Sequence, residues 1–109
     1  MTKKNLLIID DNEMLLGLIN HCYRQIFDLH LCISIADARK LLLAGLLPDA
    51  IITDLNLPNE DAKAFIQKTK SSPLYAHIPL IVLSGDETSH TRIECLKLGA
   101  DDYMVKPLV

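Results

Sequence analysis

The segment NLLIIDDNE, residues 5–13, joins a run of apolar residues directly to two adjacent carboxylates. Residues 6–9 (LLII) form the short continuous apolar run that is typical of a strand buried on both faces of a parallel sheet. Asp10 and Asp11 follow without a break, although like charges repel each other and Asp is depleted in strands. The segment therefore predicts a buried strand that ends at an acidic site.

Four more segments have the pattern of strands. Residues 50–53 (AIIT) and 80–83 (LIVL) are continuous apolar runs, and polar residues follow each of them at once. Residues 29–35 alternate apolar and more polar side chains, which is typical of a strand with one wetter face or at a sheet edge. Residues 101–105 (DDYMV) are a shorter candidate for the fifth strand.

Helical spacing fills the gaps between these strands. Apolar side chains recur three and four positions apart in four stretches: residues 15–26, 38–45, 62–69 and, more weakly, 87–98. Asn12 is placed to cap the first helix, and Gly45 and Gly99 are placed to end the second and the fourth.

The alternation of strands and helices predicts an α/β fold with a parallel sheet and helices on both faces. Right-handed crossovers restrict the topology, and the strand order 2-1-3-4-5 of a doubly wound, flavodoxin-like sheet fits best. This order puts the alternating second strand and the polar fifth strand at the edges. We expect residues 1–109 to form one domain.

Composition narrows the class of protein. Half of the 109 residues are hydrophobic, which is enough for one domain with a core of its own. The net charge is −3 and no basic patch occurs, which argues against direct binding to nucleic acid. No apolar run approaches the length of a membrane span or of a signal peptide, so we expect a cytoplasmic protein. The three Cys and four His are scattered without metal-ligand spacing, which favours reduced, structural thiols.

Chemistry-bearing residues stand where the predicted strands end. In a doubly wound sheet, sites form beyond the carboxyl ends of the strands where the strand order reverses, here between the first and third strands. Neighbouring strands lie about 4.8 Å apart, so we expect Asp10, Asp11 and Asp54 to converge. Three carboxylates at such short distances need protons or a cation to offset their negative charges. Oxygen ligands without His or Cys favour Mg²⁺.

Ser84 and Lys106, which end the fourth and fifth strands, would add a hydroxyl and a cation to this acidic volume. A metal ion, an ammonium and a hydroxyl around a carboxylate are the parts of a phosphoryl site. Asp54 is the candidate nucleophile, because Asp carboxylates form acyl-phosphates.

The whole chain resembles the receiver domain of two-component response regulators. The resemblance rests on Asp10 and Asp11 after LLII, Asp54 in IITDLNLP, Ser84 in LIVLSG, and GADDYMVKP, which ends in Lys106 and Pro107. It implies that Asp54 accepts a phosphoryl group from a phosphohistidine on a sensor histidine kinase or a histidine phosphotransfer protein.

The resemblance also implies a role for each remaining residue. Asp11 would bind Mg²⁺, or Mn²⁺ in its place, directly; Asp54 and the backbone carbonyl of Asn56 would be further ligands, and Asp10 would act mostly through water. Lys106 would pair with the phosphoryl oxygens. Ser84 would hydrogen-bond the phosphoryl group, Tyr103 would follow by changing rotamer, and the face of the fourth helix and fifth strand would switch. For Tyr103, plain packing is the other interpretation. The Lys106–Pro107 peptide bond would be cis.

One departure from the family lies at the end of the chain. The family's fifth strand leads into a fifth helix that packs beside the first, whereas this sequence stops at Val109. We therefore expect either that these residues are a piece of a longer protein, or that a second copy or another chain covers that face.

Two other functions compete with signalling. A Mg²⁺-dependent phosphohydrolase of the haloacid dehalogenase type would also use an Asp nucleophile, but it would carry a DxD motif after the first strand and a cap segment. A pseudo-receiver would only bind partners, and the complete set of acids, hydroxyl and lysine argues against it. We expect no enzyme beyond assistance to phosphorylation and dephosphorylation of Asp54 itself.

Overall fold

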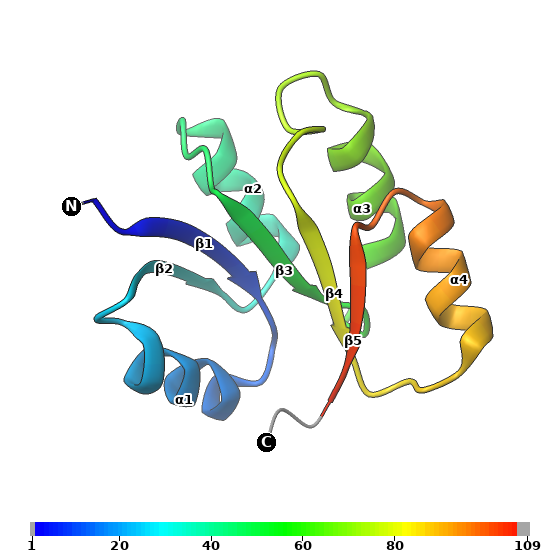
Figure 1. Ribbon diagram of the computed structural model, residues 1–109, viewed down its shortest axis with the longest axis horizontal. Helices are drawn as coiled ribbons and strands as arrows, with labels where there is room; N and C mark the ends of the chain where they lie inside the picture. The colour runs from blue at the N-terminus through cyan, green and yellow to red at the C-terminus, as the bar shows by residue number, and fades with distance from the viewer. Residues whose placement is uncertain (1, 107–109) are drawn as a thin grey trace.

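The computed structural model describes residues 2–106. Within this range strands and helices alternate along the chain (Figure 1). They are β1 (Lys4–Ile9), α1 (Glu13–Tyr23), β2 (Phe27–Cys32), α2 (Ile35–Leu43), β3 (Ala50–Asp54), α3 (Ala62–Ser71), β4 (Leu80–Ser84), α4 (Ser89–Lys97) and β5 (Asp102–Val105). None of the described helices is long and apolar enough to cross a membrane.

The strands form one five-stranded sheet in the order β2-β1-β3-β4-β5, and every neighbouring pair is parallel. The predicted α/β class, the strand order and the flavodoxin-like topology are therefore confirmed. The register aligns the carboxyl ends of the central strands, since Ile9 pairs with Thr53 and Asp54 with Leu83. Residues that follow these strands consequently meet at one edge of the sheet.

One face of the sheet is covered over its central strands. Its strand residues, such as Leu7 and Ile51, are buried in a single cluster with Leu42 of α2, Phe65 of α3 and Cys95 of α4. The continuous apolar strands are explained by this packing, because their alternate residues must also be apolar to face the opposite layer.

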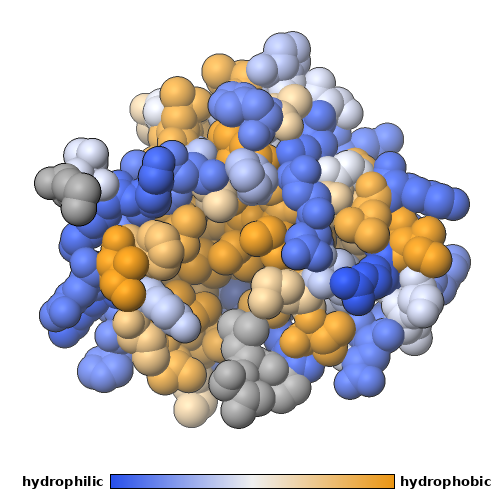
Figure 2. Space-filling view, viewed as in Figure 1, coloured by the Kyte–Doolittle hydropathy of each residue, from blue (hydrophilic) through white to orange (hydrophobic). Residues whose placement is uncertain are grey.

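The opposite face carries α1 and an open apolar groove of about 200 Å³. The groove is lined entirely by apolar and aromatic residues: Leu6, Ile8, Ile19, Tyr23, Phe27, Leu29, Ile52 and Leu83. Figure 2 shows this apolar surface over the middle of the sheet. Among the described helices, α1 is the one whose residues line it.

The predicted helix caps are confirmed, whereas several predicted boundaries differ from the structure by two or three residues. Asn12 caps α1 by accepting a hydrogen bond from the Leu15 amide, and Gly45 and Gly99 adopt the positive φ angles of helix stops. However, β2 ends at Cys32, and Ile35 is the first residue of α2 rather than the last of the strand.

Capping hydroxyls set the starts of α2 and α4. Ser34 and Thr88 are N-caps whose hydroxyls accept amides three residues ahead. The capping hydroxyl starts α2 at Ile35, before the predicted position 38, and α4 at Ser89, after the predicted position 87. Ile35 is apolar and buried, so it fits the alternating strand pattern, but in the structure it is buried as the first residue of α2.

Candidate functional site

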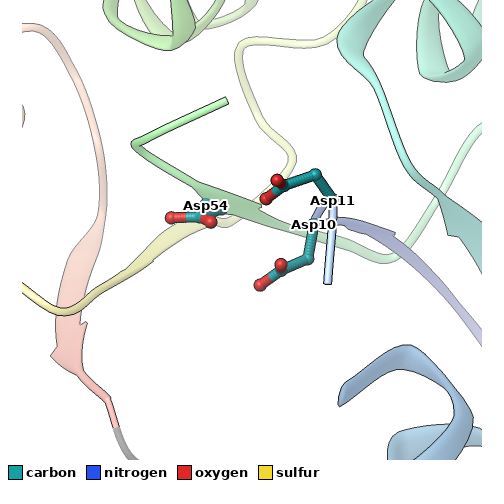
Figure 3. Close-up of side chains that lie close together, drawn as sticks. All are labelled: Asp10, Asp11 and Asp54. Atoms are coloured by element: carbon teal, nitrogen blue, oxygen red, sulfur yellow. The ribbon is translucent and has the colours of Figure 1, made fainter. Parts of the chain in front are cut away.

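Three carboxylates meet at the carboxyl end of the sheet (Figure 3). Asp10 and Asp11 directly follow β1, and Asp54 is the last residue of β3. One carboxylate oxygen from each lies within 4.8 Å of the others. Asp10 and Asp54 are buried, with 1% and 6% of their surface exposed, whereas Asp11 is exposed. The convergence follows from β1 and β3 being neighbours in the sheet.

The local chain holds Asp10 in a fixed position. Its amide continues the β1–β2 ladder by donating to the Cys32 carbonyl at 3.0 Å. Its Oδ1 accepts the Asn12 amide at 2.9 Å, and its Oδ2 lies 2.7 Å from Lys106 Nζ. Both oxygens of this buried carboxylate are therefore engaged.

Asp54 has a similar arrangement. Its Oδ1 accepts the Asn56 amide at 3.2 Å, and its Oδ2 lies 3.2 Å from Lys106 Nζ. No hydrogen bond within residues 2–106 occupies the carboxylate of Asp11, which leaves it the most accessible oxygen ligand of the three. The division between a direct ligand, Asp11, and an outer one, Asp10, stays a prediction.

Lys106 bridges the two buried carboxylates and is itself largely covered, with 23% of its side chain exposed. Burial lowers the pKa of Lys106, but the hydrogen bond to Asp10 and the charges of Asp54 and Asp10 outweigh burial, so the pKa lies above its usual value. Its backbone amide donates to the Ser84 carbonyl at 2.8 Å. Lys106 therefore contacts Asp10 at the end of β1 through its ammonium and β4 through its backbone amide.

The charges of this cluster fit a divalent cation. Three carboxylates and one ammonium leave a formal charge of −2 when all are ionised. The donor atoms are hard oxygens, which suit Mg²⁺ or Mn²⁺ and not a thiolate-seeking metal. The residues that could hold the ion are Asp10, Asp11 and Asp54, and the carbonyl of Asn56 stays a predicted further ligand.

Ser84 and Tyr103 lie beside this cluster and bind the loop between β4 and α4. Ser84 is fully buried, and its hydroxyl oxygen accepts the Asp86 amide at 3.1 Å. Tyr103 is also buried, and its hydroxyl donates to the Asp86 carbonyl at 2.6 Å. The Tyr103 hydroxyl makes a specific contact with this loop, which goes beyond plain packing.

Sequence reasoning assigned no structural role to Asp86. Its carboxylate accepts the Thr91 hydroxyl at 2.6 Å and the Thr88 amide at 2.8 Å. The Thr91 and Thr88 hydrogen bonds hold the pKa of Asp86 below its usual value. The Asp-x-Thr spacing at a helix start was the signal that could have found this contact.

A second residue that sequence reasoning missed is Glu60, whose carboxylate reaches the start of α2. No local pattern predicts this contact, because the partners lie 25 and 24 residues away. The predicted cis peptide before Pro107 lies outside the described residues.

Comparison with known proteins agrees with this geometry. The family model described as "Response regulator receiver domain" matches residues 6–109. The virulence transcriptional regulatory protein PhoP of Shigella flexneri is 36% identical over 104 residues, which cover 93% of this chain and 44% of PhoP. The chain therefore spans less than half the length of this relative.

Solved structures give the same result for the fold. The chemotaxis response regulator CheY4 of Vibrio cholerae is similar with a TM-score of 0.88 and 20% identity, over 98% of this chain and 89% of that one. A response regulator from Burkholderia pseudomallei, solved with a phosphorylated aspartic acid and a calcium ion, has a TM-score of 0.84 and 29% identity, over 98% and 62%. From the family match over residues 6–109 and the acidic cluster at the sheet's edge, we conclude that this chain belongs to the response regulator receiver domain family.

Proposed function

We propose that this domain is the phosphoacceptor of a two-component phosphorelay and that Asp54 is its phosphorylated residue. The observation that carries the proposal is the convergence of Asp10, Asp11 and Asp54 around Lys106. A carboxylate that is buried, aligned by an amide and paired with a cation has the setting of a nucleophile toward phosphorus. The Burkholderia relative, with its phosphorylated aspartic acid, supports the choice of chemistry.

The transfer step balances without a further reactant. An oxygen of Asp54 attacks the phosphorus of a partner's phosphohistidine, the P–O bond forms, and the P–N bond to imidazole breaks. The imidazole nitrogen then takes a proton from water. Mg²⁺, when bound, supplies positive charge that offsets the acids and the phosphoryl oxygens. The partner is a sensor histidine kinase or a histidine phosphotransfer protein.

Asp11, Asp10 and Lys106 have separate roles in this transfer. Asp11 offers its exposed carboxylate to the cation, and Asp10 stays paired with Lys106. Lys106 moves its hydrogen bond from Asp54, now at 3.2 Å, to the phosphoryl oxygens. This exchange replaces one anionic partner by another, so the ammonium remains paired throughout.

The change then passes to the face of α4 and β5 through Ser84. When the Ser84 hydroxyl binds the phosphoryl group, the Asp86 amide loses or shifts its 3.1 Å acceptor. The Asp86 carbonyl also holds the Tyr103 hydroxyl, so movement of this loop changes the position of the ring. The domain acts as a switch and assists only its own phosphorylation and dephosphorylation.

The open groove beside α1 points to a further protein surface. Its lining is wholly apolar, and apolar surface of this kind is stable when another element covers it. We propose that a chain segment following β5, a second copy or another chain packs there. Light scattering of the 109-residue chain tests the second copy, since it alone of the three predicts a dimer. A cytoplasmic location stays a prediction.

One experiment tests the proposed function. The protein is incubated with Mg²⁺ and acetyl phosphate, and its intact mass is measured. We expect a single acid-stable, base-labile phosphate that Asp54→Asn abolishes. Fast turnover of phosphate esters would instead indicate the phosphohydrolase, and the absence of any adduct would indicate a pseudo-receiver.

A further inference from the structure

The loop of residues 55–61, between β3 and α3, follows Asp54 directly and is held at both ends. At its start, the Asn56 amide donates to Asp54 Oδ1 at 3.2 Å. At its end, Asp61 caps α3 by accepting the Ala64 amide at 3.0 Å. Between them, Asn59 adopts a φ of 59°, in the left-handed region that asparagine tolerates better than most non-glycine residues.

Glu60 connects this loop to an element that is distant in the sequence. Its Oε1 accepts the Ile35 amide at 2.7 Å and its Oε2 accepts the Ala36 amide at 3.0 Å. These are the first two amides of α2, so the carboxylate faces the positive end of the helix dipole. Hydrogen bonds from two amides to one carboxylate are charge-assisted and fix its orientation.

Ser34 satisfies other parts of the helix start and leaves the Ile35 and Ala36 amides to Glu60. Ser34 accepts the Asp37 amide on its hydroxyl at 3.1 Å and the Ala38 amide on its carbonyl at 3.2 Å. Exposed amides at a helix start can bind water at little cost. The two contacts of Glu60 therefore do two things at once: they satisfy two amides of α2, and they fix the far side of the loop to this helix.

We propose that Glu60 is a positioning residue of the phosphoacceptor site. It holds the loop of residues 55–61 against α2, and thereby holds Asn56, whose amide aligns Asp54 and whose carbonyl is the predicted metal ligand. The inference rests on the proposed function for the role of the metal. The hold of Glu60 on the loop stands on the contacts alone.

The principal variant is Glu60→Gln, which keeps the shape of the side chain but replaces one acceptor oxygen by an NH₂ group and removes the charge. The matched control is Ser34→Ala, which weakens the same end of α2 without touching the loop. Both variants lower the melting temperature. A role in positioning predicts that the two differ in every other measurement.

Two measurements separate positioning from simple capping. Amide hydrogen exchange in metal-free protein reports on the Asn56 N–H, which we expect to exchange faster in Glu60→Gln and unchanged in Ser34→Ala. Titration with Mg²⁺ alone is expected to give about tenfold weaker binding in Glu60→Gln, as for other residues that orient a metal ligand, and unchanged binding in Ser34→Ala. Saturating Mg²⁺ restores the rate of phosphorylation by acetyl phosphate, because the loss is in binding.

Glu60→Asp provides an independent second test. It keeps the charge near the helix but is one methylene too short to reach both amides from the loop. We expect it to behave like Glu60→Gln. Wild-type behaviour of Glu60→Asp would show that only the charge at the helix start matters, and would overturn the proposal.

Failure of this inference and failure of the proposed function give different results. If wild-type protein binds Mg²⁺ and forms the Asp54 phosphate while Glu60→Gln matches it in exchange and affinity, Glu60 is a helix cap alone. If wild-type protein binds no Mg²⁺, the proposed function fails. The exchange rate of the Asn56 amide then still decides whether Glu60 holds the loop.

Discussion

Lys106 Nζ lies 2.7 Å from Asp10 Oδ2, and this ion pair joins two residues that are 96 positions apart in the sequence. It fixes the end of the last strand to the end of the first. The buried carboxylate of Asp10 has its other oxygen on the Asn12 amide, so neither oxygen is left without a partner. Several properties of the site depend on this pair.

Removal of the ammonium should make stability depend on metal. Lys106→Met leaves Asp10 buried without its cation, which is expected to lower the free energy of unfolding in metal-free buffer by up to about 3 kcal/mol. Mg²⁺ should restore most of the loss, because it supplies the missing positive charge. Urea unfolding with and without Mg²⁺ measures this, with the exposed Lys4→Met as control. Equal losses in the two buffers would contradict the expectation.

The two adjacent acids should respond differently to the same substitution. Asp11 is exposed, so Asp11→Asn removes repulsion and leaves metal-free stability unchanged or slightly higher. It should nevertheless abolish the rise in melting temperature that Mg²⁺ produces. Asp10→Asn breaks the pair with Lys106 and should lower stability without metal. Thermal melts of both variants with and without Mg²⁺ provide the comparison, and matching behaviour would mean that the acids are equivalent.

The hydroxyl of Tyr103 should matter for stability and not for metal binding. Tyr103→Phe removes its hydrogen bond to the Asp86 carbonyl at an expected cost of about 1 kcal/mol in the free energy of unfolding. The affinity for Mg²⁺ should stay the same, because this contact lies on the loop between β4 and α4. The exposed Tyr23→Phe is the control. A change in Mg²⁺ affinity in Tyr103→Phe would show that the ring acts on the acidic cluster directly.

Asp101 should contribute stability that acid removes. Burial raises the pKa of Asp101, but hydrogen bonds from Lys70 and the Leu80 amide outweigh it, so the pKa lies below its usual value. A carboxyl with a lowered pKa stabilises the fold above its unfolded pKa, and this contribution is lost as the pH falls through the folded pKa.

The stability gap between wild type and Asp101→Asn should therefore be complete at about pH 7 and should shrink as the pH falls below about 4. Urea unfolding across this range measures the gap. Asp28→Asn is the control, because the Asp28 side chain in β2 is exposed. A gap of constant size down to acid pH would show that the charge of Asp101 is not its source.

The sequence predicted the sheet well because burial on both faces is a local property. Segments such as residues 6–9 and 80–83 had to be central strands, and parallel pairing then aligned their ends. The convergence of Asp10, Asp11 and Asp54 follows from strand order alone, without any knowledge of side-chain contacts.

Contacts between distant loops and helix ends could not be predicted in this way. Glu60 accepts hydrogen bonds from two backbone amides of α2. Every residue except proline has such an amide, so no sequence pattern identifies the partners of Glu60. The end of β2 was missed because Ile35 suits a strand and a helix start equally well, and the hydroxyl of Ser34 decides between them. Such choices depend on which acceptor reaches an amide in three dimensions.

The amide of Lys106 donates to the Ser84 carbonyl at 2.8 Å, which extends the pairing of β4 and β5 by one step. Lys106 is thus delivered to the acids by β5, which is synthesised after the strands that carry the three carboxylates. Parallel pairings of this kind are non-local and form slowly, so the three carboxylates must coexist without their cation until the sheet is complete. A partly folded chain in which β5 is not yet paired would have the three carboxylates without Lys106, and its site would be incomplete. Refolding followed by Mg²⁺ binding should therefore show the site forming in the same kinetic phase as the closure of β5 onto β4.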